Sequence, residues 1–66
     1  MTPDDVMKRV RAIKLLAEDD EKAHAEEDRL YRDVLYEISR GHVDDPDSVA
    51  ACALMTQDIA FSRWYA

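Results

Sequence analysis

Apolar residues recur along this chain at the three-and-four spacing of an amphipathic helix, in three successive stretches. The clearest is the central one, residues 20–40, whose apolar face consists of Leu30, Tyr31, Val34, Leu35 and Ile38. Its charged residues, Glu27 among them, are assigned to the solvent-facing side. Gly41, the only glycine, follows at the position where helices commonly end in a left-handed residue. We therefore predict a central helix over residues 20–40.

A shorter helix is predicted before it. Thr2 is a good capping residue, and Pro3 suits the first helical position. The apolar face that follows consists of Val6, Val10, Ile13, Leu16 and Ala17. This pattern predicts a helix over residues 3–17.

The third helix is predicted to begin at residue 46, because Asp45 and Pro46 repeat the arrangement of a cap followed by proline. Residues 49–55 are apolar without interruption, so the first turns should be covered on more than one side. Helical spacing can continue through Phe61 and Tyr65, which extends this helix to residue 64. Alternatively, Thr56 caps a new short helix after a kink.

No glycine or proline separates the first two helices, so one long helix is the alternative to a hairpin. A continuous coiled-coil seam would carry Asp20, His24 and Glu27 at its centre, which is costly. A turn near residues 18–20, with Asp19 or Asp20 as cap, removes that cost. We expect an all-α fold in one domain, residues 1–66: an antiparallel helical hairpin plus a third helix, forming a three-helix bundle.

The small size of the chain favours self-association. A domain of 66 residues buries only about 60% of the surface that its unfolded chain exposes. Cys52 is the only cysteine, which excludes an intrachain disulfide, and its apolar neighbours indicate a core position. No secretory signal or membrane-spanning stretch is recognisable, so we expect a cytoplasmic protein with no membrane partner.

The charge balance argues against direct nucleic-acid binding. Fifteen acidic and nine basic residues give a net charge of −6, whereas a phosphate backbone or an anionic membrane requires clustered Lys and Arg. In a hairpin, Arg11 and Lys14 should lie beside the acidic start of the second helix. Residues 18–28 hold seven carboxylates and one lysine, which allows an alternative function as a DNA mimic that inhibits a nucleic-acid-binding protein. A solvated helix face is the favoured interpretation of this acidic segment.

Candidate chemistry is limited to one cluster. His24, Glu27 and Asp28 lie at i, i+3 and i+4, a spacing at which metal ligands can converge, and they suggest a second alternative, a small metal-dependent enzyme. A bridged site would need matching ligands from other helices, and the sequence offers none at a recognised spacing. We assign no catalytic, cofactor-binding or metal-binding residue and expect a protein that is not an enzyme.

The aromatic C-terminus is the strongest functional signal. Phe61, Arg63, Trp64 and Tyr65 lie within the last six residues, where chains are ordinarily polar. Aromatic residues and arginine dominate binding energy at protein interfaces. We predict an interface here, with a protein partner or a second copy of the chain. In the alternative interpretation the tail packs on the hairpin and completes the core.

Residues 23–38 and 56–66 resemble small uncharacterised reading frames of actinobacterial tailed phages. The resemblance carries no functional motif and therefore no catalytic residues. It implies an accessory protein that acts on a host or phage protein in the host cytoplasm. With the aromatic tail, it leads us to expect a small acidic helical protein-interaction module.

Overall fold

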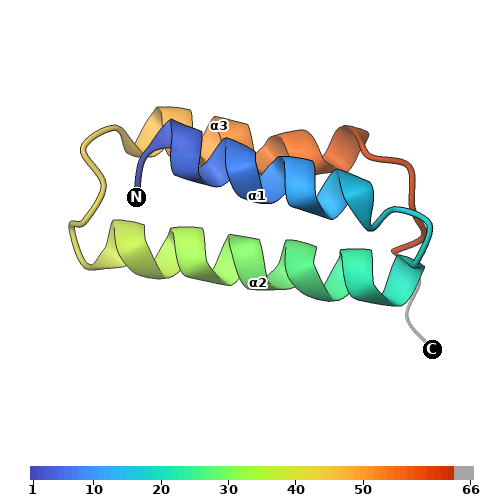
Figure 1. Cartoon of the computed structure of the whole chain (residues 1–66). Helices are drawn as coiled ribbons and strands as arrows, with labels where there is room; N and C mark the ends of the chain where they lie inside the picture. Colours follow the sequence, from blue (N-terminus) through green and yellow to red (C-terminus); the bar gives the residue numbers. More distant parts are fainter. Residues whose placement is uncertain (64–66) are drawn as a thin grey trace.

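The computed structural model describes residues 1–63 as three α-helices and a short 3₁₀ helix; Trp64, Tyr65 and Ala66 lie outside the described residues. The helices are α1 (Pro3–Leu15), α2 (Asp20–Ser39) and α3 (Pro46–Leu54), followed by η1 (Met55–Asp58). α1 and α3 run in the same direction, and α2 runs antiparallel to both (Figure 1). The predicted all-α three-helix bundle is confirmed. α1 and α2 form the expected antiparallel hairpin and are not one long helix.

Each helix begins at a side-chain cap. Thr2 accepts a hydrogen bond from the Asp5 amide at 3.2 Å, and Asp5 accepts one from the Thr2 amide at 2.9 Å, which forms a capping box. Asp19 and Asp45 cap α2 and α3 by accepting hydrogen bonds from the amides of Lys22 and Ser48. The predicted caps are confirmed, and of the two candidates for α2, Asp19 or Asp20, the cap is Asp19.

α2 ends just before Gly41, the glycine that was predicted to terminate it. Gly41 has φ 72°, and its amide donates to the carbonyl of Ile38, while the His42 amide donates to the carbonyl of Glu37. These two hydrogen bonds define a Schellman motif, which satisfies carbonyls that the helix end leaves without intrahelical partners. The chain is thereby turned towards α3.

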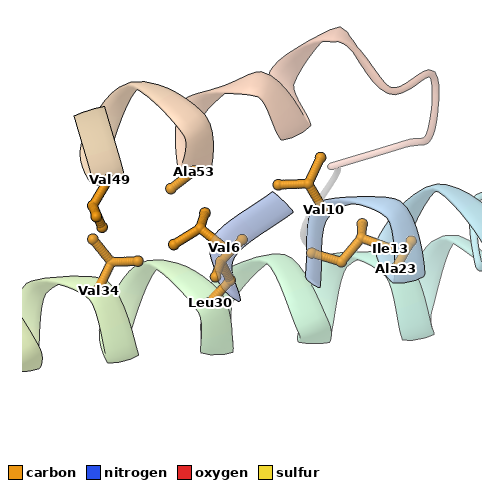
Figure 2. Close-up of a cluster of buried hydrophobic side chains, with 8 residues drawn as sticks. All are labelled: Val6, Val10, Ile13, Ala23, Leu30, Val34, Val49 and Ala53. Atoms are coloured by element: carbon orange, nitrogen blue, oxygen red, sulfur yellow. The ribbon is translucent and has the colours of Figure 1, made fainter. Parts of the chain in front are cut away.

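The core lies between the three helices (Figure 2) and consists of Val6, Val10, Ile13, Ala23, Leu30, Val34, Val49 and Ala53. Tyr31 and Ile38 pack against it at its edge. The prediction was wrong for Leu35, which is 68% exposed. The α3 residues that line the same hollow as Leu35 are Ala50, Ala53 and Leu54, so α3 covers a narrower strip of α2 than the apolar pattern suggested.

Two predicted helix ends were also wrong. α1 stops at Leu15, because tight turns take over: the Leu16 amide donates to Ile13 and the Asp19 amide to Leu16. α3 stops at Leu54, and after η1 the chain is non-helical at residues 59–63, although a helix to residue 64 was expected. The alternative of a short helix after a kink is the closer description. Thr56 lies within η1 and is fully buried, so it does not act as the cap.

The ion pair between α1 and α2 also differs from expectation. Arg9 and Asp33 form it, with Arg9 Nη1 at 2.8 Å from Asp33 Oδ2. Arg11 and Lys14 instead line a hollow between α1 and η1. The side of α1 that faces α2 therefore carries Arg9, whereas the side with Arg11 and Lys14 was expected there.

Candidate functional site

The C-terminal segment is attached to the middle of α2 by Arg63. Arg63 Nε donates to Glu27 Oε1 and Nη2 donates to Glu27 Oε2, each at 2.9 Å. Such a two-point arginine–carboxylate pair fixes direction as well as distance. The geometry fixes the position of residue 63 relative to α2.

The other donors of Arg63 are directed at main-chain carbonyls. Nη2 donates to the carbonyl of Thr56 at 2.6 Å, and Nη1 donates to those of Ile59 and Phe61 at 3.3 and 3.2 Å. The guanidinium group also lies 3.9 Å from the centroid of the Phe61 ring. All five of its N–H donors have acceptors, so one side chain joins α2, η1 and the C-terminal segment.

Glu27 is buried, with 4% of its surface exposed, yet it stays ionised. Burial is the largest single influence and raises the pKa of its carboxyl. Hydrogen bonds from Arg63 and Thr56 and the positive charge of Arg63 act in the opposite direction, and together they hold the pKa below its ordinary value. The same pair raises the pKa of Arg63 above its ordinary range, chiefly through the hydrogen bond to Glu27.

Thr56 extends this network to Tyr31. The Tyr31 hydroxyl lies 2.5 Å from Thr56 Oγ1. Thr56 also helps to hold the pKa of Glu27 down, so Tyr31, Thr56 and Glu27 belong to one polar network. The buried polar groups of α2 and η1 thus satisfy one another, and residues 1–63 contain no buried side-chain nitrogen or oxygen without a partner.

The assignment of Glu27 to the solvent-facing side was therefore wrong. The signal was present in the spacing, since Glu27 lies four residues after Ala23 and three before Leu30, both of which are fully buried. A carboxylate at a core position requires a cationic partner. The chain has nine basic residues, and the sequence does not show which of them pairs with Glu27. The partner is Arg63, 36 positions away.

A second feature is an apolar groove between α2 and α3, on the side away from α1. It has a volume of about 270 Å³ and is lined by Tyr31, Val34, Leu35, Ala50, Ala53 and Leu54. Leu35 and Leu54, on its two walls, are 68% and 53% exposed. We call this surface the α2–α3 groove. The apolar pattern did not predict this groove, because the pattern assigned Leu35 to the core.

The hollow between α1 and η1 differs in character. Its apolar residues, such as Met7 and Ile59, are surrounded by Arg11, Lys14 and Asp58. A solvated rim of both signs is ordinary protein surface. The α2–α3 groove has no charged residue in its lining.

The three candidate metal ligands do not form one site in the described residues. Glu27 is held by Arg63, while His24 Nε2 lies 3.5 Å from Asp28 Oδ1. Within residues 1–63, no group of three or more His, Cys, Asp or Glu side chains could hold a metal ion.

The acidic segment, residues 18–28, is largely engaged within the fold. Five of its seven carboxylates have partners there: Asp19, Asp20, Glu26, Glu27 and Asp28. The carboxylates of this segment therefore support capping, tail attachment and local ion pairs. Among residues 1–63, no specific contact favours the DNA-mimic alternative.

Of the four predicted interface residues, the structure describes Phe61 and Arg63 only. Arg63 forms the attachment to α2, and Phe61 packs against the core beside it; both are partly buried. Trp64 and Tyr65 lie outside the described residues, so their place in an interface stays a prediction. The Ser62 amide donates to Asp20 Oδ1 at 3.0 Å, which places the chain beside the start of α2 just before these two residues.

No protein-family model matches this chain, and no curated protein or solved structure matches it either. In the part of the chain that the structure describes, none of the helices has the length and apolar character needed to cross a membrane.

Proposed function

We propose that this protein is a small helical protein-interaction module and that the α2–α3 groove is a contact surface for its partner. The observation that carries the proposal is the pair Leu35 and Leu54, exposed on facing walls above an apolar floor. Single exposed leucines are ordinary, and Leu15, 87% exposed on α1, is one. Two that flank one groove form a contiguous patch of the kind that marks interaction sites.

The aromatic C-terminus is a second contact element in this proposal. Arg63 fixes the chain at a defined point on α2, and Trp64 and Tyr65 follow directly. Their residue types suit an interface. On the resemblance described above, the partner is a host or phage protein, and a cytoplasmic module that modulates such a protein is the concrete form of the proposal.

Selection from a random-peptide display library tests the function without a known partner. The library is panned against the wild-type protein, and recovered peptides are tested on a Leu35→Asp/Leu54→Asp variant and on a matched Leu15→Asp variant. All three leucines are exposed, so the folds should be retained, which circular dichroism checks. We expect peptides that bind the wild-type protein and the Leu15→Asp variant but do not bind the Leu35→Asp/Leu54→Asp variant. Peptides that bind all three proteins equally, or no enrichment, would refute it.

A further inference from the structure

We infer that the α2–α3 groove binds an amphipathic helix whose apolar face is flanked by basic residues. This inference rests on the proposed function, because it specifies the partner of the same groove. It follows from the shape of the groove and from the charges at its ends.

The walls of the groove are suited to a helix. On α2 the lining residues Tyr31 and Leu35 are one helical turn apart, and so are Ala50 and Leu54 on α3. Both walls are helices, whose main-chain donors and acceptors already bond to one another. An extended peptide would find no strand edge here to satisfy its own backbone. A helix satisfies its own backbone and presents apolar residues at i, i+3 or i+4 and i+7 to such a groove.

Acidic residues stand at both ends of the groove. Asp28 lies three residues before Tyr31 on α2, and Asp47 lies three residues before Ala50 on α3, so helical spacing puts each in line with its wall. Because α2 and α3 are antiparallel (Figure 1), the two carboxylates mark opposite ends. Val49 points towards Val34 (Figure 2), so Asp47, two residues before Val49, belongs to the Val34 end of the groove, whereas Asp28 belongs to the Tyr31 end.

The part of the chain that includes α3 is negatively charged, like the two carboxylates at the ends of the groove. Residues 41–58, which include all of α3, contain four aspartates and no lysine or arginine. Arg32 is the nearby cation of α2, and the whole chain carries a net charge of −6. A second copy would bring the same Asp47 and the same net negative charge to the interface, which opposes association. Asp28 lies 3.5 Å from His24 Nε2, but its side chain is 58% exposed and can accept a further contact. A partner with lysine or arginine near both ends of its apolar face complements both carboxylates.

Fluorescence anisotropy with two synthetic probes tests this inference. The first is a labelled amphipathic peptide of about 18 residues with leucines on one face and lysines along its flanks. The second has glutamate at every lysine position. We expect the lysine peptide to bind wild type about tenfold or more tightly than the glutamate peptide, with the difference shrinking as salt is added.

Matched variants separate the groove from the rest of the surface. Leu54→Ala should weaken binding of the lysine peptide about fivefold or more, and Leu15→Ala by less than about twofold. Asp47→Lys should weaken it about threefold or more, whereas Asp4→Lys should not. Asp4 is a close control, because Asp4 and Asp47 each follow the first-position proline of a helix and the two variants change the net charge equally.

Four outcomes would overturn the inference. Equal loss in Asp4→Lys and Asp47→Lys would show general charge attraction and no site. Binding of the glutamate peptide that depends on Leu54 would show that the groove binds a partner but that the partner need not be basic. Library peptides that need the groove but lack basic residues would show the same. Sedimentation showing a dimer of wild type that Leu54→Ala abolishes and Leu15→Ala retains would identify a second copy as the occupant. Failure of the library selection itself would instead reject the proposed function.

Discussion

Arg63 and Glu27, 36 residues apart in the sequence, form a two-point ion pair that joins the C-terminal segment to the centre of α2. Glu27 is buried, and 32% of the Arg63 side chain is exposed, so the pair lies at the edge of the core. A buried carboxylate is unfavourable without a partner, whereas an exposed arginine loses little on its own. The fold therefore depends on Arg63 more strongly than its terminal position suggests.

We predict that Arg63→Ala lowers the free energy of unfolding by about 2 kcal/mol. Removing one partner of a wholly buried pair costs about 3–5 kcal/mol, and access of water to Arg63 reduces that cost. Urea unfolding followed by circular dichroism measures it. Arg63→Ala combined with Glu27→Leu should be more stable than Arg63→Ala alone, because the second change removes the uncompensated charge. A double variant less stable than the single one would contradict this account.

Acid sensitivity is predicted from the same pair. The folded-state pKa of Glu27 lies below its ordinary value of 4.5, so its ionised form stabilises the fold fully above that pH. The contribution is lost as the pH falls through the lowered pKa. Glu27→Gln should therefore be less stable than wild type at pH 7 but lose less stability between about pH 5 and pH 3. Asp5 and Asp45, whose pKa values are lowered by hydrogen bonds from Thr2 and Ser48, titrate in both proteins. Parallel pH profiles of the two proteins would show that Glu27 does not contribute.

Two leucines of α2 provide a matched test of the core. Leu30 is fully buried and Leu35 is 68% exposed. Leu30→Ala should lower the free energy of unfolding by about 2–5 kcal/mol, a large share of the total for a domain of this size. Leu35→Ala should change it by less than about 0.5 kcal/mol. Urea titrations of both variants measure the difference, and similar losses would mean that the described core is not the one that stabilises the protein.

The sequence predicted those parts of the fold that local interactions determine. Thr2, Asp19 and Asp45 cap helices because their side chains reach amides three residues away, a relation visible in sequence spacing. Gly41 ends α2 for an equally local reason. The hairpin was predictable because the polar positions of the seam made a continuous helix costly.

The end of α3 and the candidate site depend on contacts between distant residues. Residues 59–63 leave the helical path, and Ser62 and Arg63 bond there to Asp20 and Glu27, a relation that no local pattern shows. The α2–α3 groove was missed for a related reason. Its existence depends on how far α3 covers α2, and the small side chains Ala50 and Ala53 leave Leu35 uncovered.

The last prediction concerns Trp64 and Tyr65, and the attachment of Arg63 determines how it should be tested. Deleting residues 61–66 would remove Arg63 as well and leave Glu27 buried without its partner, so loss of folding would say nothing about the aromatic residues. Trp64→Ala and Tyr65→Ala, made separately and together, leave that ion pair in place.

If the two aromatic residues form an interface, the variants should keep the helical circular-dichroism signal and the wild-type unfolding midpoint. They should lose affinity for a partner or for a second copy, by about 2 kcal/mol or more at Trp64. Sedimentation over a range of concentrations and the affinity of library-selected peptides measure this loss. If the tail instead completes the core, Trp64→Ala should lower the unfolding midpoint and leave mass in solution and peptide affinity unchanged, because the cost then falls on folding.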